Sequence, residues 1–231
     1  MNIYFNGDSY VAGDELDNPA TQGFATKLAS KLNATFLNQA EGGSSNSLIL
    51  RKVQEYLYEC KKSTVFPDFV VIGWSEPMRE DWFFHDTYHS VAGTGPRVET
   101  FDLLGYQYWD KHMNSSFQYL HQMSKFYNRV IHNLHRELTY LKIPHVFFNA
   151  IVPLNITEIY DPDSLQDDLL LKLSWGDNFF HPYDQEIMTW RGWAIANNHR
   201  EVTPGKFHYD ELAHTGWADV IYKYIKEKNI V

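Results

Sequence analysis

A serine stands directly after the first apolar run of the chain. The run at residues 3–5 ends at Gly7-Asp8-Ser9, where a turn would lift the Ser9 hydroxyl out of the end of a strand. A serine hydroxyl attacks an ester carbonyl when a histidine takes its proton and backbone N–H groups hold the oxyanion. Gly, Asp and Ser also form ordinary turns, so the tripeptide alone does not establish a nucleophile.

Two histidines near the carboxyl terminus could serve as the base. His208 precedes a helical pattern that begins near Leu212, and His214 lies within the first turns of that pattern. His208 is the preferred base, because a histidine ahead of the helix can reach the end of a sheet. His214 is the alternative, with Glu211 three residues before it as the acid that would orient the imidazole.

Two further turns carry groups that can bind an oxyanion. Gly42 and Gly43 precede a helical pattern, so their turn exposes backbone N–H groups at the start of a helix. Ser75 follows the apolar stretch DFVVI, and either its hydroxyl or the amide of Asn46 could supply one more donor. The sequence leaves the choice between Ser75 and Asn46 open.

An aromatic and a cationic residue follow the same apolar stretch. Trp74 and Arg79 are candidates for contact with the substrate, although core packing and a surface ion pair are the ordinary roles of such residues. His85 and His89 are four residues apart, which suits two metal ligands on a helix. No third ligand is recognisable, so the sequence predicts no metal site.

Alternating strand and helix patterns must position these groups. Strand patterns fall at residues 2–7, 34–37, 68–72 and 145–149, and helical patterns at 24–32, 46–58, 116–141 and 210–226. This alternation predicts a parallel sheet with helices on both faces. Because parallel strands end at one edge of the sheet, Ser9, the glycine turn and Ser75 are expected to meet there.

Two segments show no regular pattern. Residues 80–114 are rich in turn residues, and we interpret them as a long loop or insertion within a single domain that spans residues 1–231. Residues 155–200 are mixed in character, and no element is assigned to them.

The overall composition excludes several classes of function. The net charge is −9 and the pI is about 5.6, so neither a nucleic acid nor an anionic membrane surface is an expected partner. Cys60 is the only cysteine, so no disulfide can form within the chain. The sequence shows no signal peptide and no apolar stretch long enough to span a membrane. The phosphate-binding motifs GxxxxGK[ST] and GxGxxG are absent, so a nucleotide-binding protein ranks last and no cofactor is expected.

Four blocks of the sequence, taken in order, resemble the SGNH (GDSL-type) hydrolase family. They are GDSY at 7–10, GGSSN at 42–46, IGWSEPMR at 72–79 and HYDELAHTGWA at 208–218. The last three blocks are similar to those of compact SGNH-like proteins of tailed bacteriophages. The resemblance implies an α/β fold of three layers (α/β/α, flavodoxin-like) with a roughly five-stranded parallel sheet.

The resemblance also implies a serine esterase or deacetylase that acts without a metal on an acyl or acetyl ester, often on a carbohydrate. Ser9 would be the nucleophile and His208 the base, and the N–H groups of Ser9 and Gly43 would form the oxyanion hole. The expected partner is a small-molecule or glycan ester. A phage protein of this type would lie in the host cytoplasm or the phage particle, as a homo-oligomer or a virion component.

Two positions depart from the family pattern. The third block of the family carries an Asn that donates to the oxyanion, and Ser75 stands at that position here. The family places an Asp three residues before the catalytic His, and Gly205 occupies that position before His208. These departures support a second hypothesis, in which the chain is a non-catalytic virion structural or carbohydrate-binding protein on the same scaffold.

Overall fold

A five-stranded parallel sheet forms the centre of the molecule. The computed structural model describes residues 1–84, 87–91, 117–154 and 173–231. Within them the strand order is β2–β1–β3–β6–β7, with all neighbours parallel. The strands are β1 (Asn2–Asn6), β2 (Thr35–Asn38), β3 (Phe69–Trp74), β6 (His145–Asn149) and β7 (Phe179–Phe180).

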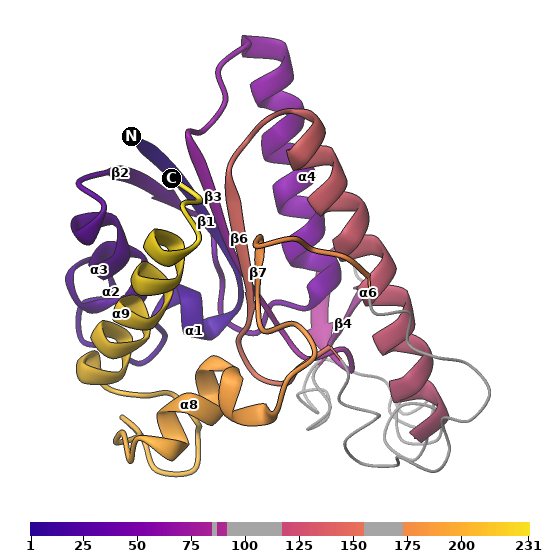
Figure 1. The fold of residues 1–231 in the computed structure, drawn as a ribbon. Helices are drawn as coiled ribbons and strands as arrows, with labels where there is room; N and C mark the ends of the chain where they lie inside the picture. Colours follow the sequence, from indigo (N-terminus) through magenta and orange to yellow (C-terminus); the bar gives the residue numbers. More distant parts are fainter. Residues whose placement is uncertain (85–86, 92–116, 155–172) are drawn as a thin grey trace.

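Helices cover both faces of this sheet (Figure 1). One face packs against α3 (Phe24–Lys31) and α9 (Glu211–Glu227), and the other against α4 (Asn46–Ser63) and α6 (Phe117–Tyr140). The shorter elements are α1 (Ser9–Ala12), α2 (Pro19–Gln22), a 3₁₀ turn (Glu186–Met188) and α8 (Trp190–Ala196). The three-layer α/β/α architecture confirms the predicted fold class.

The central strands are buried on both faces, which explains their unbroken apolar sequences. Along β3, Phe69 and Val71 join the core beside α3 and α9, whereas Val70 and Ile72 join the core beside α4 and α6. Successive side chains of a strand point to opposite faces, so a strand between two helical layers needs an apolar residue at every position.

The predicted boundaries of the strands and long helices lie within two residues of those in the structure, except that α4 runs to Ser63 instead of residue 58. Residues 80–114 were predicted to be a long loop or insertion, but the described part contains an antiparallel pair of strands, β4 (Glu80–Phe84) and β5 (Thr87–Val91). The interpretation of residues 80–114 as an insertion in a single domain stays a prediction, because residues 92–116 lie outside the described part. In the unassigned segment 155–200, the described residues contain β7 and α8.

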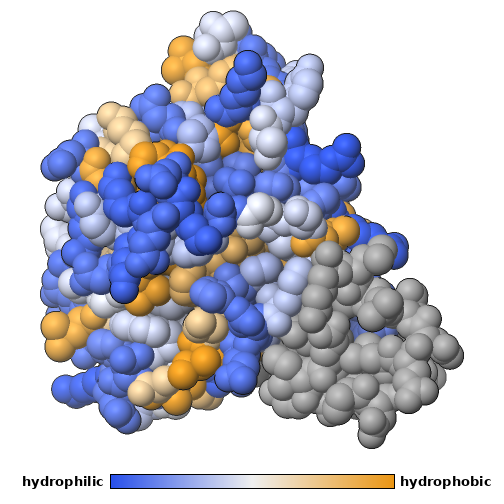
Figure 2. All heavy atoms as spheres, in the orientation of Figure 1, coloured by the Kyte–Doolittle hydropathy of each residue, from blue (hydrophilic) through white to orange (hydrophobic). Residues whose placement is uncertain are grey.

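The described residues on the face of the molecule shown in Figure 2 are mostly polar. Hydrophilic residues surround scattered apolar ones on the face shown in Figure 2. In the part of the chain that the structure describes, no helix combines the length and the apolar character that crossing a membrane requires.

Two glycines let α1 sit directly on the ends of the central strands. A Cβ atom at Gly7 would lie 2.4 Å from Val11 Cγ2, and one at Gly73 would lie 2.6 Å from the same atom. Gly7 follows β1 and Gly73 is in β3, so Val11 packs against both strand ends. Ser9 stands two residues before Val11, and this close packing therefore sets the height of Ser9 above the sheet.

We expect the substitution Gly73→Ala to lower the free energy of unfolding by about 1–3 kcal/mol, the usual cost of overpacking a core. The new methyl group would meet Val11 Cγ2 at 2.6 Å and the ring of Phe148 at 2.8 Å. Urea denaturation followed by circular dichroism measures the loss. The double variant Gly73→Ala/Val11→Ala should lose less than the sum of the two single losses, because Val11→Ala removes the nearest clash. Strictly additive losses would contradict this packing.

Candidate active site

Ser9 is the first residue of α1 and lies at the carboxyl end of β1. The carboxylate of Asp8 caps this helix by accepting a hydrogen bond from the backbone N–H of Tyr10 at 3.1 Å. The helix ends at Gly13, whose φ of +80° favours glycine and whose N–H donates to the carbonyl of Ser9 at 2.9 Å. The single helical turn is thus closed at both ends, and Ser9 is held in a defined orientation.

One cavity at the carboxyl edge of the sheet contains both Ser9 and His208. Its volume is about 140 Å³. The residues that line it are Ser9, Tyr10, Glu76, Arg79, Ile151, Arg191, Lys206, Phe207 and His208. In Figure 1, α8 crosses this end of the molecule below the sheet. The structure therefore brings together the predicted nucleophile and the preferred base.

A short hairpin-like loop before α9 holds His208. Glu201 and Tyr209 form an antiparallel bridge, and the carbonyl of His208 accepts from the N–H of Val202 at 2.8 Å. At the tip of the loop, the N–H of Gly205 donates to the carboxylate of Glu201 at 2.6 Å. These bonds fix the backbone of His208 before the helix begins.

Glu15 is the carboxylate that lies beside His208. Its Oε1 atom is 3.4 Å from His208 Nδ1, and both side chains are about one-fifth exposed. Burial raises the pKa of Glu15, but hydrogen bonding with Thr203 and His208 outweighs burial and lowers the pKa overall. The sequence analysis missed Glu15, because the acids in the loop after α1 belong to no recognisable motif. Its φ of +67° is the one unusual feature, and only the structure reveals it.

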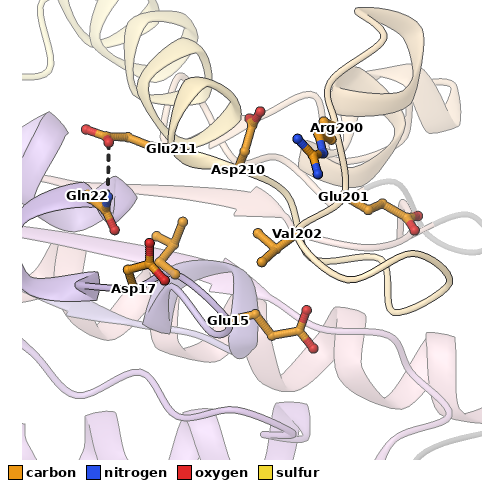
Figure 3. A pocket seen from close by; sticks show the side chains of 9 residues that line it. Glu15, Asp17, Gln22, Arg200, Glu201, Val202, Asp210 and Glu211 are labelled. Atoms are coloured by element: carbon orange, nitrogen blue, oxygen red, sulfur yellow. Dashed lines mark hydrogen bonds between the residues drawn. The ribbon is translucent and has the colours of Figure 1, made fainter.

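The alternative base His214 lies outside this cavity, among the packed helices. Its side chain is 3% exposed, and its Nδ1 atom accepts a hydrogen bond from the N–H of Phe24 at 3.1 Å. Burial lowers the pKa of His214 to about 3, so the imidazole is neutral at physiological pH. Glu211, the predicted acid of this pair, forms an ion pair with Lys27 and accepts from Gln22 at 3.2 Å (Figure 3).

Asn46 and Ser75 are joined to each other rather than exposed to the cavity. The amide of Asn46 donates to the carbonyl of Ser75 at 3.0 Å and accepts from its N–H at 2.8 Å. This pair ties the start of α4 to the end of β3. The hydroxyl of Ser75 is buried without a hydrogen-bond partner of good geometry among the described residues, and it interacts with the carboxylate of Asp8.

The glycine turn lies beside the end of β1. The N–H of Glu41 donates to the carbonyl of Gly7 at 3.2 Å, which joins the turn to the residue before Asp8. Gly42 lies against Asp14, and a Cβ at Gly42 would lie 1.9 Å from a carboxylate oxygen of Asp14, so that side chain would have to move. Gly43 has a φ of +80°, and a Cβ added there would meet no atom within 4 Å. It does not belong to the lining of the cavity with Ser9.

Arg79 connects three loops under the cavity. Its guanidinium lies 3.8 Å from the carboxylate of Asp8 and 3.5 Å from that of Glu76, and it donates to the carbonyl of Ser44 at 3.4 Å. Burial raises the pKa of Asp8, whereas the charge of Arg79, the hydrogen bond from the N–H of Tyr10 and the nearby hydroxyl of Ser75 oppose that rise. Arg79 is thus both a lining residue and the counter-charge of a buried carboxylate.

Trp74 requires a correction. It was a candidate for contact with the substrate, with core packing as the alternative, but its side chain is fully buried in the core beside α4 and α6, with its ring 5.5 Å from that of Phe147. The apolar run of β3 continues through Trp74, so the residue ends the strand rather than beginning the exit loop. His85 and the side chain of His89 lie outside the described part. Among the described residues, no group of three or more His, Cys, Asp or Glu is arranged to hold a metal ion.

The parallel sheet and its two helical layers form an α/β/α sandwich with the fold of SGNH hydrolases. No model of a protein family and no curated protein matches the sequence. Solved structures do match. A psychrotrophic esterase, EstA from Pseudoalteromonas sp., determined in a form inhibited by monoethylphosphonate, is 14% identical with a TM-score of 0.51; the match covers 98% of this chain and 97% of EstA.

Two more distant structures carry similar descriptions. A lipolytic protein of the G-D-S-L family from Desulfitobacterium hafniense is 9% identical with a TM-score of 0.45, over 96% of this chain and 98% of that one. The acetyl xylan esterase AlAXEase is 14% identical with a TM-score of 0.47, over 97% and 100% of the two chains. At such identities these likenesses concern the fold.

The neutral, buried state of His214 predicts a specific dependence of stability on pH. Its pKa is about 3 in the folded chain, below the ordinary 6.5, so the unfolded state binds more protons between these values. The contribution of His214 is complete above about pH 6.5 and is lost as the pH falls toward 3, by about 1.4 kcal/mol per pH unit. We therefore expect the substitution His214→Asn, which keeps an acceptor for the N–H of Phe24, to reduce the dependence of the free energy of unfolding on pH between pH 4 and pH 6.5, within the range set by that pKa. Urea denaturation at several pH values measures this dependence. If the free energy of unfolding changes equally with pH in the wild type and in His214→Asn, the titration of His214 is not the cause of that change.

Proposed function

We propose that the chain is an ester hydrolase in which Ser9 is the nucleophile and His208 is the general base. The observation that supports this most is that the two side chains, which are far apart in the sequence, line one cavity at the carboxyl edge of the sheet. Open α/β sheets place their sites at this edge. The structural likeness to an esterase agrees with the proposal at the level of the fold.

The reaction proceeds in two steps. His208 takes the proton of the Ser9 hydroxyl as its oxygen attacks the ester carbonyl, and the resulting oxyanion collapses to an acyl-serine. His208 then gives the proton to the departing alcohol. In the second step His208 takes a proton from water, the hydroxide oxygen attacks the acyl carbon, and Ser9 recovers its proton as the carboxylic acid leaves. One ester and one water thus become one acid and one alcohol.

Glu15 acts as the acid that orients the base. A carboxylate beside Nδ1 favours the tautomer that leaves Nε2 free to accept a proton, and it stabilises the imidazolium that forms. The 3.4 Å separation between Glu15 and His208 Nδ1 supports this role, and it tightens readily once the ring is charged. Glu15 takes the place of the family's Asp, which would stand at Gly205.

Backbone N–H groups of Ser9 and Gly43 form the oxyanion hole of the proposed enzyme. The first N–H groups of a helix have no acceptor within that helix, so the N–H of Ser9 is available to a ligand. The hydroxyl of Ser75 is the candidate for a third donor, because Asn46 already binds the backbone of Ser75. Asn46 then serves to position Ser75.

The substrate is a small or glycan-borne acyl or acetyl ester. This part of the proposal, like a role in the phage particle or the host cytoplasm, rests on the resemblance of the four sequence blocks. Assembly into a homo-oligomer or a virion follows from the same resemblance.

Hydrolysis of 4-nitrophenyl acetate tests the two central assignments. We expect Ser9→Ala and His208→Ala each to reduce kcat/KM by about a thousandfold or more, because the nucleophile and base act as a unit. His214→Asn should keep activity within about threefold of the wild type, since His214 stays neutral and buried outside the cavity. A comparable loss in His214→Asn, with circular dichroism unchanged, would move the base to His214 and make Glu211 the acid.

Glu15→Gln tests the acid. We expect a fall in kcat of about tenfold to a thousandfold with little change in KM, because a neutral amide stabilises the imidazolium less and favours the wrong tautomer. Asp17→Asn is the matched control, because Asp17 lies in the same loop and lines the neighbouring pocket without contacting His208. Equal effects of the two substitutions would remove Glu15 from the mechanism.

Absence of catalysis would favour the other hypothesis. If wild type and Ser9→Ala hydrolyse 4-nitrophenyl acetate and acetylated xylan at the same background rate, the chain is a non-catalytic structural or carbohydrate-binding protein on this scaffold.

A further inference from the structure

The lining of the cavity with Ser9 carries positive charge that the proposed hydrolysis does not use. Arg79, Arg191 and Lys206 line the cavity, and Glu76 is the one carboxylate among its lining residues in the described part of the chain. The whole chain has a net charge of −9, so this group of cations runs against the overall balance. A cleft lined by one sign of charge concentrates ligands of the opposite sign.

Arg191 differs from Arg79 in having no counter-charge. The guanidinium of Arg79 faces the carboxylates of Asp8 and Glu76. Arg191 forms no ion pair with another described residue, and its buried Nε–H has no hydrogen-bond partner among them. The ring of Phe207 lies 4.3 Å from the guanidinium carbon. Stacking of this kind orients a guanidinium while its in-plane N–H groups stay available for a carboxylate.

Two buried tyrosine hydroxyls lie in the same region. The hydroxyls of Tyr10 and Tyr209 have no hydrogen-bond partner among the described residues, and their ring centres are 6.3 Å apart. The charge of Arg191 acts on both phenols, and Tyr10 also lines the cavity. Buried donors without partners destabilise a fold unless a ligand or water accepts from them. A group of unpaired donors around one guanidinium is suited to bind an anion.

The position of these donors indicates which part of the substrate they meet. Lys206 and Phe207 directly precede His208 in the same loop, and Arg191 stacks on Phe207. His208 gives its proton to the departing alcohol, so the groups around His208 contact the alcohol portion of the ester.

We propose that the substrate is an ester whose alcohol portion carries a carboxylate, a proposal that rests on the proposed ester hydrolysis. Arg191 and the hydroxyl of Tyr10 bind this carboxylate. An O-acylated sugar acid or hydroxy acid has this chemistry. A second pocket of about 240 Å³ has Glu15 in its lining (Figure 3). Its lining includes five carboxylates, those of Glu15, Asp17, Glu201, Asp210 and Glu211. Like charge there repels the substrate's carboxylate, so it is directed toward Arg191.

A matched pair of esters tests this specificity. The probes are 3-acetoxybenzoate, which is anionic, and methyl 3-acetoxybenzoate, which is neutral with the same acyl group. We expect Arg191→Gln to lower kcat/KM for the anionic ester by about tenfold or more, the weight of one charge-assisted contact, and to change the neutral ester by less than about twofold. Arg200→Gln is the control, because Arg200 lines only the second pocket and should leave both rates unchanged. An equal loss on both esters, or none on the anionic one, overturns the proposal.

A binding measurement separates this proposal from the hydrolase itself. In a Ser9→Ala background, calorimetry should show that Arg191→Gln weakens binding of 3-acetoxybenzoate by about tenfold. If wild type hydrolyses neither ester yet binding depends on Arg191, the ester hydrolase fails and the anion site stands. If hydrolysis depends on Ser9 but neither binding nor rate depends on Arg191, the hydrolase stands and the anion site fails.

Discussion

The rest of the site depends on how the buried carboxylate of Asp8 is paired. Asp8 is fully buried at the end of β1, where a lone charge would be very costly. The guanidinium of Arg79 and the N–H of Tyr10 offset this cost, and each of them also holds a part of the site in place. The N–H of Tyr10 starts the helical turn that presents Ser9. Arg79 reaches from the exit of β3 and also binds the carbonyl of Ser44 in the glycine turn. Asp8 and Arg79 come from different loops, and either of them without the other would be an uncompensated buried charge. The loops around Ser9 therefore depend on each other for their stability.

Two strained residues fix the other half of the site. Glu15 and Phe207 both have positive φ angles, +67° and +61°, which cost side-chain-bearing residues about 1–2 kcal/mol each. Glu15 lies beside His208, and Phe207 directly precedes it. The cross-loop hydrogen bonds of His208 and Gly205 hold the strained loop in place. The strain is therefore placed where it sets the position of the imidazole, as is common at sites that must be preorganised.

The parts that could be predicted from the sequence are those whose burial leaves a periodic or unbroken apolar pattern. The strands 2–7 and 68–72 and the long helices follow from this pattern, and so does the meeting of their ends. To predict Ser9 and His208 as candidate site residues, the motif blocks were needed in addition to this pattern. Trp74 was misjudged because an apolar strand and its exit look alike in sequence. The strands β4 and β5 were missed because turn residues, such as those in HDTYH, interrupt the alternation of apolar and polar residues by which a strand is recognised in a sequence. Glu15 and Arg191 carry no pattern at all, since their roles depend on chain segments that only tertiary packing brings together.

The distribution of charge around His208 has consequences for each step of the proposed reaction. Glu15 stands on the side of the second pocket, whose carboxylates favour the positive imidazolium that forms when the proton leaves Ser9. On the side of Ser9, the charge of Arg79 is balanced by the carboxylates of Asp8 and Glu76. The proposed oxyanion hole consists of N–H and O–H donors, so the developing oxyanion does not depend on Arg191. The acidic lining of the second pocket thus enters the two proposals in two ways. It favours the imidazolium of the proposed mechanism, and it repels a carboxylate on the alcohol portion of the proposed substrate, which leaves Arg191 as the group that binds it.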